Sequence, residues 1–192
     1  MDSHAQTHRA IGVVLMGLLF GARLYAQKPE DVTGWGELTW NMGLPQVKEQ
    51  YPQYTIEQGR GPHLVNGQIV ENTDDPDTLV IKNFDIDGIK VDVNVHRRPD
   101  NPRLAHITLD PNLLKGPMAI SGIRESTYDR FKKLLMSKYG APNEVRTPTE
   151  DGDVVIKAVW SFPSTSIELT RHESRYGGYV LLSYEAVRKN PL

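Results

Sequence analysis

The residues of this chain whose types suit chemistry occupy alternate positions on two neighbouring strand-like segments. They are Asp92, Asn94, His96, His106, Thr108 and Asp110. A chain reversal at residues 100–102 pairs His96 with His106 across two antiparallel strands. Imidazole and carboxylate groups that share one sheet face can bind a divalent transition metal or act as a pH sensor. We favour the alternative of an ordinary solvated strand face, because the carboxylates lie about two residue steps from the imidazoles, roughly 6–7 Å.

Two further stretches carry residue types that occur in binding sites. Residues 71–77 (ENTDDPD) are rich in oxygen ligands but lack the D-x-[DN]-x-[DN]-G spacing of a calcium loop, which favours an acidic surface turn. Trp35 and Trp40, with Tyr51 and Tyr54, are able to form an exposed aromatic platform for a sugar or a peptide. The alternative is that they close the ends of the core, and this is the interpretation that we favour in a fold this small.

Composition and motifs exclude several classes of function. The 192-residue chain contains no cysteine, which excludes disulfide bonds, thiolate zinc sites, a cysteine nucleophile and a lipid anchor on cysteine. The net charge of −2 provides no basic field for nucleic acid. The sequence has no G-x-S-x-G elbow, P-loop or H-E-x-x-H motif. We therefore expect no catalytic residue, cofactor or bound metal, with a hydrolase assembled from distant residues as the alternative.

The first 26 residues resemble a secretory leader. His8 and Arg9 precede an apolar run over residues 10–22, and Leu24-Tyr25-Ala26 forms a cleavage site. The run is too short to span a bilayer comfortably, because spanning takes about 20 apolar residues. Cleavage after Ala26 is favoured over retention as an anchor. Both outcomes place the folded part outside the cytoplasm, in the periplasm or the extracellular medium, with no stable membrane span after cleavage.

Strand patterns dominate the middle of the mature chain. Asp87-Gly88 is a preferred two-residue hairpin turn, and it pairs Phe84 with Val91 and Asp85 with Lys90. The next strand covers residues 104–110. Further strands are expected at residues 154–162, 165–172 and 178–187, and on this register His172 lies opposite Leu181. Residues 53–77 are rich in Gly, Pro, Asn and Asp, which predicts a loop, with a short strand at residues 63–65 as an addition to it.

Two helices are expected. The first follows Gly43-Leu44-Pro45 and ends before Pro52, because proline fits the first turn of a helix and cannot continue one. The second begins with Ser126 as N-cap and carries an apolar stripe that includes Tyr128, Phe131 and Leu135. Gly140 is the expected residue just past its end.

The two halves of the chain share one hydrophobic pattern. Residues 155–172 repeat residues 79–96 at an offset of 76 residues, which places Phe84 on Trp160 and His96 on His172. The predicted fold class is α+β, with two tandem repeats of a helix and three antiparallel strands. The repeats share one antiparallel sheet with the helices packed on one face. The predicted divisions are a leader at 1–26, a first repeat at 27–114 and a second at 115–192.

This arrangement resembles the β-lactamase-inhibitor-protein-like fold and the small outer-membrane assembly lipoproteins of the SmpA/BamE type. Met42-Gly43-Leu44-Pro45-Gln46-Val47 is similar to the G-M-[ST]-x-x-x-V helix opening of those proteins, with Met before Gly and Leu44 in place of the hydroxyl residue. The resemblance implies a protein-binding or envelope-associated role without catalysis. Two hypotheses of other kinds remain: a secreted hydrolase or metal-binding protein that uses the His96/His106 face, and a ligand pocket lined by Phe84, Trp160 and Phe131.

Overall fold

A computed structural model describes residues 29–65, 68–111, 121–147, 149–150, 153–174 and 177–188. The expected leader lies outside these residues. The elements are β1 (Gly34–Trp35), β2 (Leu38–Thr39), α1 (Leu44–Gln50), β3 (Ile56–Val65), β4 (Gln68–Ile86), β5 (Ile89–Arg98), β6 (Asn101–Pro111), α2 (Ser121–Tyr139), β7 (Glu144–Arg146), β8 (Thr149–Glu150), β9 (Asp153–Ser161), β10 (Thr165–Ser174) and β11 (Gly177–Ala186).

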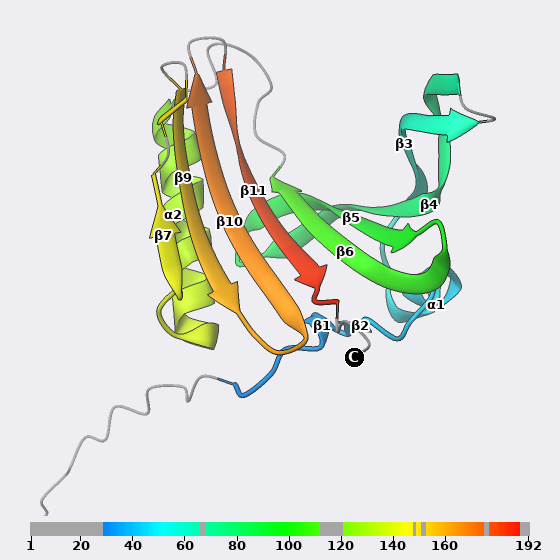
Figure 1. Ribbon diagram of the computed structural model, residues 1–192, viewed down its shortest axis with the longest axis horizontal. Helices are drawn as coiled ribbons and strands as arrows, with labels where there is room; N and C mark the ends of the chain where they lie inside the picture. The colour runs from blue at the N-terminus through cyan, green and yellow to red at the C-terminus, as the bar shows by residue number, and fades with distance from the viewer. Residues whose placement is uncertain are drawn as a thin grey trace, which may run out of the picture.

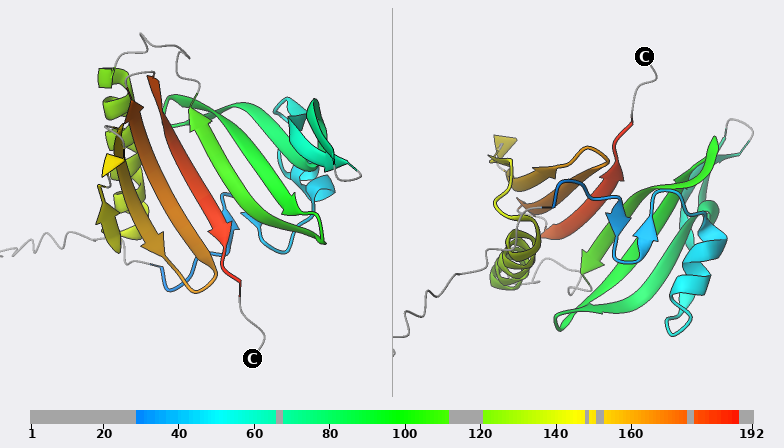
Figure 2. Two further views of the ribbon diagram at one scale, coloured as in Figure 1. Left: turned by 45° about the horizontal axis from the view of Figure 1, so that its top comes forward. Right: turned by 90° about the horizontal axis from the view of Figure 1, so that it is seen from below.

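One antiparallel sheet organises the described chain (Figure 1). Its strand order is β3-β4-β5-β6-β11-β10-β9-β7, and β8 also pairs with β9. β1 and β2 form a separate two-stranded sheet. The two views of Figure 2 place α2 beside the strands from the C-terminal half and α1 beside those from the N-terminal half. The last strands of the two halves, β6 and β11, join the halves through direct antiparallel pairing.

The predicted registers of the β4–β5 and β5–β6 hairpins are confirmed. Phe84 lies opposite Val91 and Asp85 opposite Lys90. Asp87 and Gly88 both have positive φ, at 51° and 76°, as a two-residue turn of this type requires. His96 lies opposite His106. Alternation of apolar and polar side chains fixes these registers, because a slip of one residue would turn every apolar side chain to the wrong face.

The core is a layer of apolar side chains between one sheet face and the two helices. One row crosses the sheet through adjacent strand partners and is fully buried: Ile81, Val93, Leu109, Leu182, Leu169 and Ala158. Val47 of α1 and Phe131 of α2 belong to the same cluster. Partners across antiparallel strands point to the same side of the sheet. Both helices therefore cover the apolar face, and no helix of the described residues lies on the other face.

The predicted fold class is wrong. The described chain is mostly strand, and its two helices differ greatly in length, at 7 and 19 residues. The sheet also contains β3, β7 and β8, and a second small sheet precedes α1. The molecule is therefore not a pair of helix-plus-three-strand repeats. The similarity of residues 79–96 and 155–172 reflects two buried hairpins, and it could not reveal edge strands that bury little apolar surface.

The largest local error concerns residues 53–77, for which the composition predicts a loop with at most a short strand at residues 63–65. They contribute β3 and the first part of β4, which pair antiparallel through two register shifts, at Gln58/Gly59 and Gly61/His63. Figure 1 shows the far ends of these strands bent away from the rest of the sheet. Backbone pairing is available to any sequence, and bulges accommodate glycine in a strand. Turn-rich composition therefore did not exclude strands here.

Smaller differences concern α2 and β10. The helix α2 begins at Ser121, so Ser126 lies within it and is not its N-cap. Its end is as predicted, because Gly140 follows with φ 78°. The partner of His172 is Tyr179, not Leu181. The predicted register of β10 on β11 was thus shifted by two residues. No helix within the described residues has the length and apolar character needed to cross a bilayer.

Candidate functional site

The two histidines lie side by side on the sheet face that carries no helix. Their rings stack with centroids 5.5 Å apart and planes 25° from parallel. The Thr78 hydroxyl donates to Asp75 Oδ2 over 2.6 Å and lies 2.8 Å from His96 Nδ1. Because the hydroxyl hydrogen is directed at the carboxylate, His96 Nδ1 is the donor to Thr78. This leaves the lone pair on the His96 ring at Nε2.

Burial determines the electrostatics of the histidine pair. Desolvation lowers the pKa of His96, the nearby His106 lowers it further, and Asp75 opposes both effects. Desolvation also lowers the pKa of His106, against an opposing effect of Glu185. A lowered histidine pKa favours neutral rings at pH 7, and neutral rings can stack without charge repulsion. The pair is therefore suited to packing at neutral pH and to charging under mild acid.

The aspartates of the predicted group lie four residues along their strands from the imidazoles, a separation of about 13 Å and so twice the predicted one. Asp92 forms an ion pair with Lys82 and accepts the Asn83 backbone N–H over 3.1 Å. Asp110 lies directly opposite Asp92 on β6. Asn94 and Thr108 lie opposite each other in the row between the aspartates and the histidines. The six predicted residues do share one face, but they form three separate cross-strand pairs and not one convergent site.

Within the described ranges, no three His, Cys, Asp or Glu side chains are arranged to hold a metal ion. A catalytic zinc site takes three protein ligands and a structural one takes four. The hypothesis of a metal between His96 and His106 therefore lacks a third protein ligand in this part of the chain. The acidic stretch 71–77 is likewise not a surface turn. Its Asp77 pairs with Arg97 at 2.6 Å, from Oδ1 to Nη2.

The aromatic residues divide between two environments. Trp35 is buried and meets Phe84 edge to face, with ring centroids 5.2 Å apart. Tyr54 stacks on Phe84 at 4.8 Å, and Tyr51 packs against both rings. The four rings of Trp35, Tyr51, Tyr54 and Phe84 therefore close one end of the core. Trp40 is only half-buried, and its Nε1 donates to Thr165 Oγ1 over 2.7 Å.

The predicted pocket lined by Phe84, Trp160 and Phe131 is not formed. Phe84 belongs to the aromatic cluster just described, whereas the indole N–H of Trp160 donates to the Gly140 carbonyl over 2.9 Å. Trp160 and Phe131 are almost completely buried, at 0% and 1% exposure. The three side chains therefore serve as core.

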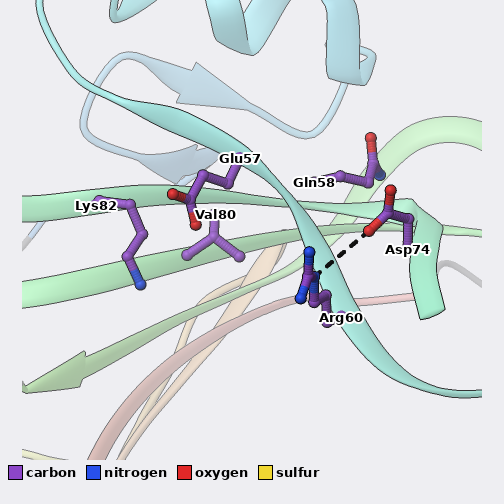
Figure 3. Close-up of a pocket in the computed structure, with 6 residues that line it drawn as sticks. All are labelled: Glu57, Gln58, Arg60, Asp74, Val80 and Lys82. Carbon is purple, nitrogen blue, oxygen red and sulfur yellow. Dashed lines mark ion pairs between the residues drawn. The ribbon is translucent and has the colours of Figure 1, made fainter. Parts of the chain in front are cut away.

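A cleft on the outer face of β3 and β4 is lined by mixed charges (Figure 3). Its lining residues are Glu57, Gln58, Arg60, Asp74, Val80 and Lys82, and its volume is about 620 Å³. Arg60 and Asp74 form an exposed ion pair, with Nε 3.5 Å from Oδ1. Lys82 is paired with Asp92. Opposite charges neutralise each other within this cleft, so it has little preference for a charged ligand.

A second cleft, of about 660 Å³, lies at the C-terminal end of β11. Trp40, Arg98, Arg103 and Arg188 contribute to its lining. They come from the segment before α1, from both sides of the β5–β6 turn and from the end of the described chain. Sequence reasoning singled out Trp40 but missed the arginines, because no local pattern places Trp40 or Arg188 beside the turn that carries Arg98 and Arg103.

Comparisons with known proteins give little further information. No family model matches the chain, and none of the curated proteins matches it. A solved structure of a DUF4309 family protein (YjgB) from Bacillus subtilis subsp. subtilis str. 168 is 15% identical. The match covers 79% of this chain and 83% of that one, with a TM-score of 0.36. This chain is distantly similar to that protein.

Proposed function

We propose that this chain is an exported, non-catalytic binding module that presents the helix-free face of its sheet to a protein partner. One observation supports this most directly: carboxylates on that face are held in ion pairs. Asp92 is paired with Lys82, and Glu168 with Lys157 at 2.9 Å. A general base or nucleophile needs a free, activated group within reach of a substrate.

The same pairs favour binding. Side chains already fixed by ion pairs and hydrogen bonds lose less conformational freedom when a partner covers them. Most residues in the middle of the face are only half-exposed, among them Asn94 and Thr108. The face therefore offers a preorganised, polar surface, as is common at the interfaces of proteins that also exist alone.

The sheet edges are less suitable for binding. A peptide can add as a strand only to a long, regular edge. The β3 edge is interrupted by two bulges and contains Pro62, which lacks a backbone donor. At the opposite edge β7 and β8 are only 3 and 2 residues long. Short and bulged edges prevent strand addition, which leaves the face as the larger surface available to a partner.

Site-specific photocrosslinking in the producing cells tests the proposal. A photoreactive residue at Thr108, in the middle of the face, is expected to yield one discrete adduct. The matched control is Met136, which is exposed at 43% on α2, on the far side of the sheet. Adducts of equal yield at both positions, or at neither, would refute an interface on the sheet face. Fractionation of the same cells tests export, since a cytoplasmic product contradicts the leader.

A hydrolase is the second candidate, because Asp75, Thr78 and His96 form a hydrogen-bonded chain that orients the imidazole. An oriented neutral histidine is the usual general base of hydrolases. A screen of ester, peptide and glycoside substrates with the wild-type chain and with His96→Gln distinguishes the two functions. Hydrolysis that is lost in His96→Gln would support the enzyme, and equal background rates support the binding module.

A further inference from the structure

The cleft at the end of β11 differs from the rest of the surface in its charge. Arg98, Arg103 and Arg188 all line it, and no Asp or Glu is among its described lining residues. None of these three guanidinium groups has a described carboxylate within ion-pair distance. Other described arginines do pair with carboxylates: Arg60, Arg97, Arg146 and Arg171. A chain of net charge −2 therefore gathers in one cleft three cations that pair with no carboxylate of the described residues.

The walls of the cleft are held by hydrogen bonds between distant segments. The Leu104 N–H donates to the Met42 carbonyl over 2.8 Å. The Val187 N–H donates to the Ser164 carbonyl over 3.1 Å. The Trp40 indole is held by Thr165, as described above. Figure 2 shows the N-terminal segment running past the end of β11. The cleft is therefore formed before any ligand arrives, which reduces the entropic cost of binding.

The remaining lining residues indicate the kind of ligand. Trp40, Leu104 and Ala105 contribute apolar surface, and Asn41 and Asn101 contribute amide groups. An aromatic side chain can cover the apolar face of a sugar ring, and amides can donate to and accept from hydroxyl groups. Guanidinium groups bind carboxylates in a bidentate manner. The volume of about 660 Å³ lies within the range typical of small-ligand pockets.

From these observations we infer that the cleft bounded by Trp40, Arg98, Arg103 and Arg188 binds an acidic saccharide, with its carboxylates on the arginines and a ring face on Trp40. This site lies apart from the middle of the sheet face and does not depend on the proposed protein partner. Inorganic polyanions satisfy the arginines but leave the apolar wall unused. Neutral sugars can cover the apolar wall but carry no carboxylate for the arginines.

The test uses the indole N–H signals of the three tryptophans in a ¹H–¹⁵N spectrum of the purified chain. Trp35 and Trp160 are buried, at 8% and 0% exposure, and serve as internal references. Trigalacturonate is expected to shift the Trp40 signal in a saturable manner and to leave the other two unchanged. Maltotriose, a neutral trisaccharide, and inorganic pyrophosphate are expected to bind at least tenfold more weakly.

Matched charge variants complete the test. Arg98→Gln and Arg188→Gln are each expected to weaken trigalacturonate binding roughly tenfold, or by about 1.4 kcal/mol, because each removes a charge-assisted hydrogen bond to a carboxylate. Arg146→Gln, a change of the same charge at an exposed position on β7, should bind like wild type. Three results would overturn the inference: no Trp40 shift with trigalacturonate, maltotriose or pyrophosphate binding as tightly, or equal weakening by Arg146→Gln.

Discussion

Leu109 on β6 and Leu182 on β11 lie directly opposite each other at the junction between the two halves of the sheet. They are 0% and 3% exposed and belong to the buried row that crosses the sheet. Their contact joins residues 73 positions apart in the sequence. The apolar layer is continuous at this point, so the halves share one core and should unfold together.

Shortening one side chain at the junction should destabilise the whole chain. Leu182→Ala is expected to reduce the free energy of unfolding by about 2–5 kcal/mol, because it removes buried methyl groups and leaves a cavity. Leu181→Ala, at a half-buried position on the opposite face, is the matched control and should cost less. Urea denaturation followed by circular dichroism measures both. Two separate transitions in Leu182→Ala would show that the halves unfold independently.

The bond between Trp40 and Thr165 should matter for stability. Thr165 is completely buried, and its hydroxyl accepts from Trp40 Nε1 and donates to the Val32 carbonyl. Thr165→Val preserves the shape of the side chain but leaves the indole N–H of Trp40 and the Val32 carbonyl without this hydrogen-bond partner. We expect a loss of about 1–3 kcal/mol in thermal or urea unfolding. Thr108→Val, on the half-exposed face, should stay within about 0.5 kcal/mol of wild type. Equal stability of both variants would contradict the structural role of the bond.

Mild acid should destabilise the protein through the stacked histidines. Burial lowers the pKa of His96 and His106 below the ordinary value of 6.5. In the interval between the lowered and the ordinary pKa, the unfolded chain binds more protons than the folded one. Stability is therefore fully retained above pH 6.5 and declines as the pH falls through the folded-state pKa. The urea concentration at which half of the protein is unfolded should therefore decrease when the pH is lowered from about 7.5 to about 5.5.

Removing one imidazole should reduce the dependence of stability on pH. His106→Gln eliminates one titrating ring and its repulsion on His96, so its urea midpoint should change less over the same interval. Thr108→Val keeps both histidines and should follow wild type. A His106→Gln variant with an unchanged slope would assign the pH dependence to other groups.

The Asp87-Gly88 turn should require glycine because of its positive φ, and not because a side chain at this position would clash with its neighbours. Gly88 has φ 76°, and a Cβ built there would meet only Arg130 Nη2, at 3.7 Å. Gly88→Ala is therefore expected to cost about 1–2 kcal/mol through strain alone. Gly88→Asn should cost less, because asparagine tolerates positive φ better. Thermal unfolding of the two variants measures the difference, and an equal cost would point to a steric clash.

The sequence by itself determined the local elements that bury apolar side chains. Alternation fixed β5 and β6 with their registers, the Asp-Gly pair fixed the turn before β5, and the glycine after α2 fixed the end of that helix. These signals are readable because each depends on residues within a few positions. The same alternation placed His96 opposite His106.

Only the tertiary structure decided how these elements combine. The pairing of β6 with β11, the extension of the sheet by β3 and the short edge strands all depend on backbone hydrogen bonds between distant segments. Backbone groups are the same in every residue, so such pairing leaves little trace in side-chain patterns. The arginine cleft arises for the same reason: Trp40 and Arg188 meet the turn that carries Arg98 and Arg103 only because distant chain segments lie side by side there.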